Sequence, residues 1–266
     1  MDEQSIQEKV TFSFGENWQS YLETVSENEI ESARQDILQW ISEEEISGKN
    51  VIDVGSGSGV HSLSFYLSGA GKLFSFDYDQ NSVDATKTLW QKSKEPENWT
   101  VAHGSILDKE YVQSLGTFDI VYSWGVLHHT GSMWEAIENA ARLVKQGGIF
   151  WISLYTKGPL YPKHLALKKK YNAASQWGKR RMVWKAVAIL MAVRLRHRKN
   201  PFAWNEKRIR GMNVYHDIID WLGGLPYEVV SADEILQFGR EHGLILERIN
   251  PLNEGGCSSY LLRKSK

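Results

Sequence analysis

The sequence predicts an α/β fold with a mostly parallel sheet of seven strands, and three observations support this prediction. Short apolar segments alternate with helical patterns from residue 50 to residue 155, as in chains whose parallel strands are connected by helices. The first apolar segment runs directly into a glycine-rich turn, with the sequence Val-Ile-Asp-Val-Gly-Ser-Gly-Ser-Gly at 51–59. Two further strand patterns, at 244–249 and 258–263, close the chain.

The first part of the chain, 1–48, is predicted to be helical. Apolar residues recur with helical spacing between Ile30 and Ile41. An aromatic cluster at 12–21, which includes Trp18, precedes them in an expected turn and short helix. The first residues are polar and acidic, unlike a signal peptide, and no apolar run reaches the ~20 residues that span a bilayer. We therefore expect a cytoplasmic protein.

Strands and helices alternate through the central part of the chain. The predicted strands are 50–54, 72–77, 99–102, 118–123 and 148–155. The predicted helices are 59–68, 80–92, 108–115 and 132–144. Asp108 is expected to cap the third of these helices, because a side-chain oxygen at that position accepts from orphan backbone N–H groups.

The last part of the chain combines a helical insertion with a return to the core. Residues 160–222 are predicted to be mostly helical, with Pro159, Pro162 and Pro201 interrupting the pattern. Ser231 and Glu234 then have the spacing of a capping box. We expect an N-terminal helical and aromatic segment, a ligand-binding core, a basic helical insertion and a closing helix and hairpin, at 1–48, 49–156, 157–226 and 227–266.

The glycine turn, residues 55–59, points to a nucleotide-like ligand. Glycine allows the backbone to approach a ligand and to adopt angles that other residues disfavour. Asp77 ends the next strand, 24 positions after Asp53, where an acid suits a ribose diol. The spacing is G-x-G-x-G, not the G-x-G-x-x-G of a dinucleotide site, and no Gly-Lys-Ser/Thr follows. Asp53 would repel a pyrophosphate and attract a cationic amino acid end, which favours S-adenosylmethionine over NAD.

Four segments, in order, carry a resemblance to a known family. They are VIDVGSGSG at 51–59, FSFDYD at 74–79, HGSILD at 103–108, and FDIVYSWGVLHHTG at 118–131 followed by ARLVKQGGIFWISLY at 141–155. The chain resembles the class I S-adenosylmethionine-dependent methyltransferases, and most of all the branch with the ubiquinone-biosynthesis O-methyltransferases and many small-molecule and sugar methyltransferases. The resemblance implies a Rossmann-like sheet whose C-terminal hairpin forms an antiparallel edge. It is weak over 156–226, where such enzymes usually choose their substrate.

The cofactor is expected to lie against the ends of the first, second and fourth predicted strands. Asp53 would attract the ammonium group, Asp77 would accept from both ribose hydroxyls, and Tyr78 would cover the adenine face. The resemblance places Ser105 and Ile106 at the adenine edge. Ser123 or its backbone would hold the methionine end, and Trp124 would border the methyl group. The expected cofactor contacts are Asp53, Gly55, Ser56, Gly57, Gly59, Asp77, Tyr78, Ser105, Ile106, Ser123 and Trp124.

His128 and His129 follow the fourth strand and are the catalytic candidates. Transfer to a hydroxyl oxygen requires its deprotonation, and a histidine with a pKa near neutrality suits a general base. Spacing does not decide between the two, although His129 is preferred. A phenol-like acceptor would depend on a base less than an alcohol would. No metal-ligand motif occurs in the sequence, so no metal is expected.

Charge is distributed unevenly along the chain. Residues 157–210 hold 16 of the 31 Lys and Arg residues but only one of the 32 acids, Glu206. An apolar run, 183–193, lies between the basic clusters. Three interpretations stay open: a helical cap over the active site, a contact with a membrane or lipid substrate, or a pocket for an anionic acceptor. Nucleic acid is not favoured, because Ser-Trp-Gly-Val replaces the Asn/Asp-Pro-Pro-aromatic motif of nucleobase amino methyltransferases.

The acceptor contacts are less sharply indicated than the cofactor contacts. Candidates are Trp18, Tyr215, His216 and Trp221, from aromatic and polar clusters, while Cys257 is expected to be a small buried filler. The preferred function is methyl transfer to a small-molecule hydroxyl. The alternatives are transfer to a lipid-linked or polyprenyl acceptor at a membrane surface and a cofactor-binding scaffold without catalysis. The sequence does not indicate the oligomeric state.

Overall fold

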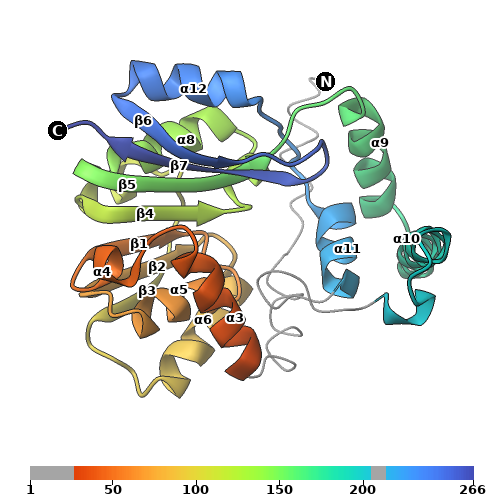
Figure 1. The fold of residues 1–266 in the computed structure, drawn as a ribbon, viewed down its shortest axis with the longest axis horizontal. Helices are drawn as coiled ribbons and strands as arrows, with labels where there is room; N and C mark the ends of the chain where they lie inside the picture. Colours follow the sequence, from red (N-terminus) through yellow and green to blue (C-terminus); the bar gives the residue numbers. More distant parts are fainter. Residues whose placement is uncertain (1–26, 205–213) are drawn as a thin grey trace.

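The computed structural model describes residues 27–204 and 214–266, and its centre is a seven-stranded sheet with the strand order β3-β2-β1-β4-β5-β7-β6 (Figure 1). β1 to β5 run parallel to one another, and β7 lies antiparallel between β5 and β6. The expected antiparallel edge is therefore present. The strands are β1 (Asn50–Val54), β2 (Lys72–Asp77), β3 (Trp99–His103), β4 (Phe118–Trp124), β5 (Val144–Tyr155), β6 (Leu244–Asn250) and β7 (Cys257–Lys264).

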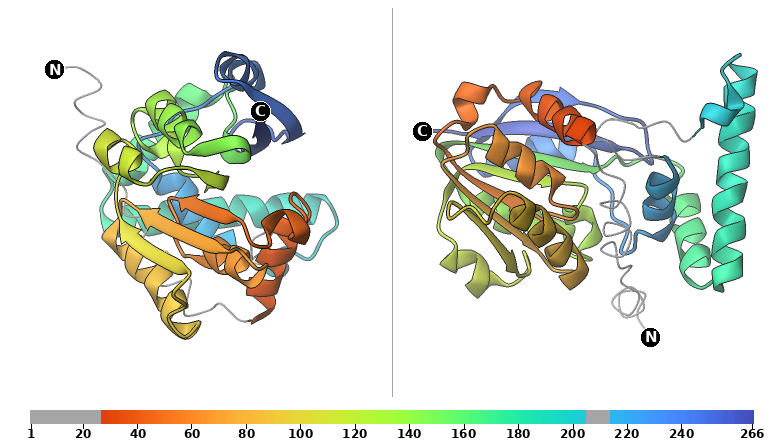
Figure 2. Two further views of the ribbon diagram at one scale, coloured as in Figure 1. Left: turned by 90° about the vertical axis from the view of Figure 1, so that its left-hand side faces the viewer. Right: turned by 90° about the horizontal axis from the view of Figure 1, so that it is seen from below.

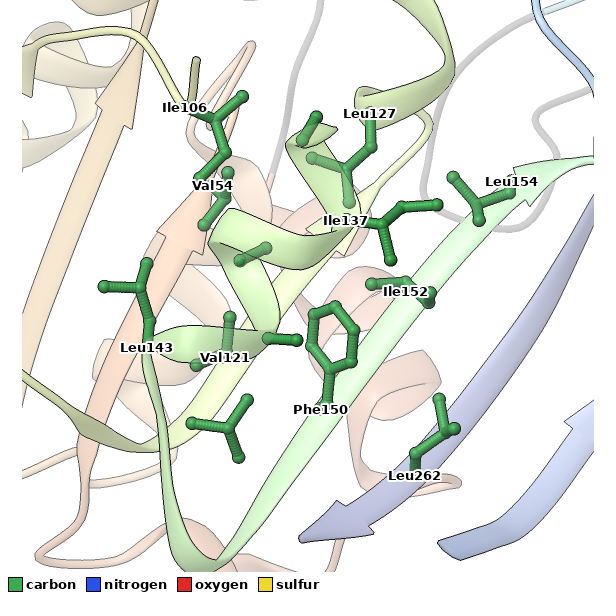
Figure 3. Close-up of a cluster of buried hydrophobic side chains, with 14 of the residues drawn as sticks. Val54, Ile106, Val121, Leu127, Ile137, Leu143, Phe150, Ile152, Leu154 and Leu262 are labelled. Atoms are coloured by element: carbon green, nitrogen blue, oxygen red, sulfur yellow. The ribbon is translucent and has the colours of Figure 1, made fainter. Parts of the chain in front are cut away.

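Helices cover both faces of the sheet, as the alternating sequence pattern predicts. Buried residues of α3, α5 and α6 form one apolar cluster with the sheet, and those of α7, α8 and α12 form the other. In the second cluster Ile137 of α8 lies beside Phe150 and Ile152 of β5 (Figure 3). The helices are α3 (Glu27–Leu38), α4 (Glu43–Ile46), α5 (Val60–Leu67), α6 (Gln80–Lys92), α7 (Lys109–Ser114), α8 (Met133–Arg142) and α12 (Ala232–Glu241).

Local sequence signals set several helix ends. The Asp108 carboxylate accepts from the backbone N–H groups of Glu110 and Tyr111, so its role as an N-cap is confirmed. Ser231 and Glu234 form the expected capping box at the start of α12. The helical prediction for the N-terminal segment is confirmed over α3, whereas the aromatic cluster with Trp18 lies outside the described residues.

A helical cap leaves the core at the carboxyl end of β5. It comprises α9 (Tyr161–Asn172), α10 (Gln176–Arg196), the 3₁₀ turn η2 (Pro201–Ala203) and α11 (Val214–Gly223). Tyr171 of α9, Val183 of α10 and Leu222 of α11 pack into one small cluster that joins the three helices. α10 is the outermost element and lies clear of the sheet (Figure 2). The predicted helicity of 160–222 is confirmed wherever that stretch is described.

Candidate active site

A cleft of about 1310 Å³ opens between the core and the cap, at the carboxyl ends of β1, β2, β4 and β5. Open parallel sheets bind ligands at this edge. The core side of the cleft carries the glycine turn and the acids Asp53, Asp77 and Asp79, and the cap side carries residues of α10 and α11.

The glycine turn requires glycine for reasons of both angle and space. Gly55, Gly57 and Gly59 all have positive φ, at 78°, 54° and 77°. A Cβ on Gly55 would come within 2.4 Å of Val126 Cγ1, and one on Gly59 within 2.8 Å of Thr86 Cα. Gly55 and Gly57 border the cleft together with Ser56, whereas Gly59 packs against α6 and does not. The absent side chains at Gly55 and Gly59 therefore make room for Val126 and Thr86, while the backbone of Gly55 and Gly57 borders the cleft.

Asp53 is buried at the end of β1 and also borders the cleft. Its Oδ2 accepts from the Ser62 hydroxyl at 2.6 Å, which in turn accepts from Ser75 at 2.8 Å. Trp99 Nε1 donates to Ser75 at 2.9 Å. This chain of hydrogen bonds connects β1, α5, β2 and β3, and it fixes a carboxylate next to the glycine turn.

Asp77 ends β2 and bridges two backbone segments. Its Oδ2 accepts from the Gly57 N–H at 2.9 Å, and its Oδ1 accepts from the Asp79 N–H at 2.9 Å. Burial raises the pKa of Asp77 to about 6, although the two backbone N–H groups oppose that shift. Each carboxylate oxygen accepts more than one hydrogen bond. Hydroxyl donors from a ligand would therefore find acceptors here and would stabilise the ionised form.

Besides Gly59, four more of the expected cofactor contacts do not border the cleft. Tyr78 is 67% exposed and stacks on His103, with the ring centroids 6.2 Å apart. Ser105 accepts from the Leu107 N–H, and Ile106 is buried in the core. Ser123 Oγ donates to the Val54 carbonyl at 2.8 Å and is buried.

The alternating direction of side chains along β4 explains why Ser123 does not border the cleft. Successive side chains of a strand point to opposite faces, so Tyr122 and Trp124 share a face that Ser123 does not. Both aromatic residues border the cleft, and this supports the expectation for Trp124. The Tyr122 hydroxyl lies 3.0 Å from His61 Nδ1, and His61 borders the cleft as well. Tyr122 and His61 are two wall residues that sequence reasoning missed.

The two histidines lie in the 3₁₀ turn η1 (Leu127–His129) and border the cleft, but neither has a pKa near neutrality. Burial lowers the pKa of His128 well below its usual value and that of His129 to about 3, with Lys168 adding to both shifts. The expectation of a histidine base with a pKa near neutrality is therefore wrong for both residues. Both shifts favour the neutral imidazole.

Hydrogen bonds assign the tautomer of each histidine. His128 Nδ1 accepts from the Tyr155 N–H at 3.3 Å, so its Nε2 carries the proton. That buried Nε2 has no hydrogen-bond partner among residues 27–204 and 214–266. His129 Nδ1 lies 2.6 Å from the Pro226 carbonyl oxygen, which only accepts, so Nδ1 carries the proton of His129.

Lys168 is the main residue that sequence reasoning missed. Its side chain is fully buried, and its Nζ donates to the Trp221 carbonyl. The Nζ lies 4.5 Å from the ring centroid of Tyr227, 4.6 Å from that of Trp221 and 5.3 Å from that of Tyr155. Burial lowers the pKa of Lys168 to about 7. A usable signal existed, because Lys168 falls in helical phase with Tyr161, Leu165 and Tyr171 on the buried side of α9.

Of the acceptor contacts expected among the described residues, some border the cleft and others do not. Trp221 borders the cleft, and its Nε1 donates to the Gly255 carbonyl at 2.9 Å. Tyr215 and His216 do not border the cleft, and the Tyr215 ring centroid lies 6.4 Å from that of the exposed Trp184 on α10. Cys257, expected as a buried filler, borders the cleft and is only partly buried.

The cap wall of the cleft is both apolar and cationic. α10 contributes Ile189, Leu190 and Val193 together with Arg181 and Lys185. The cleft therefore has an acidic, glycine-rich end and an end lined by apolar and basic side chains. Within the described part of the chain no group of three His, Cys, Asp or Glu residues is placed to hold a metal.

Comparison with known proteins identifies a family and a fold. The family model described as "Methyltransferase domain" matches residues 45–208. Over 106 residues the chain is 31% identical to the tRNA U34 carboxymethyltransferase of Idiomarina loihiensis, covering 40% of this chain and 32% of that protein. Over 103 residues it is 34% identical to the ribosomal protein L11 methyltransferase of Bacillus cytotoxicus, covering 39% and 31%. These matches span about a third of each relative.

Two solved structures share the fold. Magnesium protoporphyrin IX methyltransferase from Synechocystis PCC 6803, crystallised with SAH, has a TM-score of 0.54 at 15% identity, over 87% of this chain and 82% of that one. An O-methyltransferase family protein from Burkholderia thailandensis has a TM-score of 0.53 at 16% identity, over 87% and 55%. At these identities the likeness shows the fold alone.

Proposed function

This chain belongs to the methyltransferase-domain family, and from that premise we propose that it transfers a methyl group from S-adenosylmethionine to the hydroxyl of a small-molecule acceptor. The family assigns the cofactor and the class of reaction. The proposal concerns the chemistry of the acceptor, which has to be inferred from this chain's own residues.

The residues at the core end of the cleft fit S-adenosylmethionine. Gly55 and Gly57 border the cleft with backbone alone, and Asp53 places a carboxylate beside them. Asp77 has a raised pKa and two fixed oxygens, which suit a pair of hydroxyl donors. When bound, the cofactor supplies a methyl group that its sulfonium has already activated.

The unpartnered N–H of His128 carries the proposal for an oxygen acceptor. Buried donors are nearly always paired, and a buried donor left alone costs about 1–3 kcal/mol. His128 borders the cleft, and its side chain is fully buried in the described structure. An acceptor oxygen hydrogen-bonded to Nε2 would satisfy this donor and would be held at the entrance to the cofactor end. Much of the catalysis of a displacement is such positioning.

The low pKa values of both histidines favour an acidic acceptor. A neutral imidazole with a pKa of about 3 removes a proton poorly from an aliphatic alcohol. The Lys168 Nζ lies over the rings of Tyr155 and Trp221, which border the cleft, and at pH values below its pKa of about 7 its positive charge would stabilise an acceptor oxygen that arrives ionised. We therefore favour a phenol-like hydroxyl.

The names of the relatives bring RNA and protein into consideration as acceptors. The relatives named above are a tRNA carboxymethyltransferase and a ribosomal protein methyltransferase. The sequence-based view that nucleic acid is not the acceptor has no support from these comparisons. Because the matches span only about a third of each relative, the acceptor is a matter for direct assay.

The first experiment is calorimetric titration with S-adenosylhomocysteine, with NADH as the control. Micromolar binding of the former alone is expected. Release of S-adenosylhomocysteine is then measured with phenols, aliphatic alcohols, total tRNA and ribosomal protein. Turnover on phenols that His128→Phe lowers more than tenfold, at unchanged cofactor affinity, supports the proposal. Turnover on RNA or protein alone would refute it, and binding without turnover on any acceptor would indicate a scaffold.

A further inference from the structure

α10 contains an apolar run, 183–193, that only Lys185 interrupts, and yet the helix has little contact with the rest of the protein. Of its 21 residues only Val183 and Val187 are buried. Trp177, Trp184 and Leu195 are 73%, 55% and 65% exposed. A helix of this composition is normally buried in a core or covered by a partner. The exposed apolar side chains of α10 therefore indicate a surface that binds an apolar partner.

The exposed side chains are arranged in an ordered way. Residues 177, 184 and 195 fall on one line along the helix, because their separations are close to whole turns of about 3.6 residues. Arg181, Lys185 and Arg196 follow within about a third of a turn and are exposed as well, and Arg181 and Lys185 stand where this side of the helix meets the border of the cleft. This outer face, defined by residues 177, 181, 184, 185, 195 and 196, combines large apolar groups with cations.

The surroundings of the outer face are strongly basic. The stretch 157–204 contains 13 Lys and Arg residues and neither Asp nor Glu. The nearest acids of the packed neighbour α11, Asp217 and Asp220, border the cleft. A second copy of the chain would bring the same cations against this face, so self-association there is opposed by like charges.

The shape of the cap makes the outer face accessible. α10 forms the edge of the molecule and runs clear of the sheet, so that its outer side is not screened by the core (Figure 2). A helix of 21 residues is about 31 Å long, enough to lie flat on an extended surface. Phe202, which follows in η2, is exposed as well and extends the apolar surface.

We propose that the outer face of α10 binds the surface of an anionic lipid bilayer. Tryptophan and leucine side chains enter the boundary between headgroups and acyl chains, and each nearby Lys or Arg contributes about 1 kcal/mol with acidic lipids. RNA would pair with the cations but would leave Leu195 and Phe202 against a polar partner. α10 lies on the bilayer, since no helix in the described residues is long and apolar enough to span one.

The geometry also connects this surface to the cleft. Ile189 and Val193 of α10 border the cleft and are themselves exposed. The apolar wall of the cleft thus continues onto the helix that meets the lipid. Membrane binding itself does not depend on the proposed function, and it is tested without any acceptor.

Co-sedimentation with vesicles tests the proposal. The chain is mixed with phosphatidylcholine vesicles that contain or lack phosphatidylglycerol, and with total tRNA in a separate arm. Binding to the anionic vesicles alone is expected. Arg181→Glu with Lys185→Glu should weaken it at least about 30-fold, from two lost contacts of about 1 kcal/mol each. Lys87→Glu with Lys92→Glu, an equal charge change on exposed residues of α6, should leave it unchanged.

A second readout separates insertion from surface charge alone. Lipids with brominated acyl chains should quench tryptophan fluorescence of the wild-type chain, and Trp177→Ser with Trp184→Ser should lose most of that quenching. Circular dichroism establishes that each variant is folded. The proposal is overturned if the wild type does not sediment with anionic vesicles or if both charge-reversal pairs behave alike. It is also overturned if the wild type binds tRNA through Arg181 and Lys185 and does not bind vesicles.

Discussion

The buried Lys168 should make the stability of the protein depend on pH in a way that one substitution removes. Burial lowers the pKa of Lys168 from 10.5 to about 7. Between these two values the unfolded chain holds a proton that the folded chain has lost, so stability rises with pH. Below the folded pKa both states are protonated, and the full cost of burying the charge is present.

The size of the effect follows from the two pKa values. For a group with a pKa of about 7 when folded and 10.5 when unfolded, the folded state is about 3 kcal/mol more stable relative to the unfolded state at pH 9 than at pH 6. Lys168→Met keeps most of the side-chain volume but does not titrate. The free energy of unfolding of the wild type relative to this variant should therefore rise by about 2–3 kcal/mol over that range.

Urea unfolding followed by tryptophan fluorescence at pH 6, 7, 8 and 9 measures this difference. Other groups that titrate in this range affect both proteins equally and cancel. Lys169→Met, at the exposed neighbouring position of α9, is the matched control and should show no such pH dependence relative to the wild type. Parallel pH profiles for the wild type and Lys168→Met would show that Lys168 is not held in an apolar cage, and would refute the reasoning.

Three further predictions concern the cofactor end of the cleft and one helix end. Asp77→Ala should strongly weaken S-adenosylhomocysteine binding, and calorimetry that shows unchanged affinity in the variant would exclude the ribose assignment. In the wild type, the affinity should fall up to about tenfold per pH unit below about pH 6, because Asp77 gains a proton there. Gly55→Ala should cost at least about 2 kcal/mol of stability, because φ is positive and the new Cβ meets Val126; a wild-type unfolding midpoint would contradict this. Ser231→Ala should cost about 1 kcal/mol in urea unfolding, because Ser231 Oγ no longer accepts from the Glu234 N–H, and a loss below about 0.3 kcal/mol would show that the cap contributes little.

The fold could be predicted closely because its signals are local. The strands and the capped helices follow from periodicity, glycine and capping residues within short windows. β5 is the one strand whose start differs by several residues, beginning at Val144 and not at 148. The residues 144–147 are polar or glycine in part, and their pairing with β4 depends on a neighbour that the local pattern does not include.

The chemistry of the site could be predicted only in part, because it depends on contacts between distant segments. Asp53, Gly55 and Trp124 lie at the cleft as expected, since their positions follow from the ends of strands. The tautomer and the pKa of His129 do not follow from the ends of strands. The tautomer is set by the carbonyl of Pro226, 97 positions away, and the pKa by burial and by the charge of Lys168. No spacing rule within one segment indicates such partners.

Lys168 shows how the two halves of the cleft depend on each other. Within a run of three lysines it resembles an ordinary exposed cation, but α9 turns it inward against Tyr155 of the core and Trp221 of the cap. Burial is the main cause of the lowered pKa of both histidines, which follow β4, and the charge of Lys168 adds to it. The core motifs therefore set the acidic, glycine-rich end of the cleft, while Lys168 of the cap contributes to the low pKa of the neighbouring histidines. Exchange of the cap between relatives should accordingly change the range of acceptor acidity that is methylated, without changing how the cofactor is held.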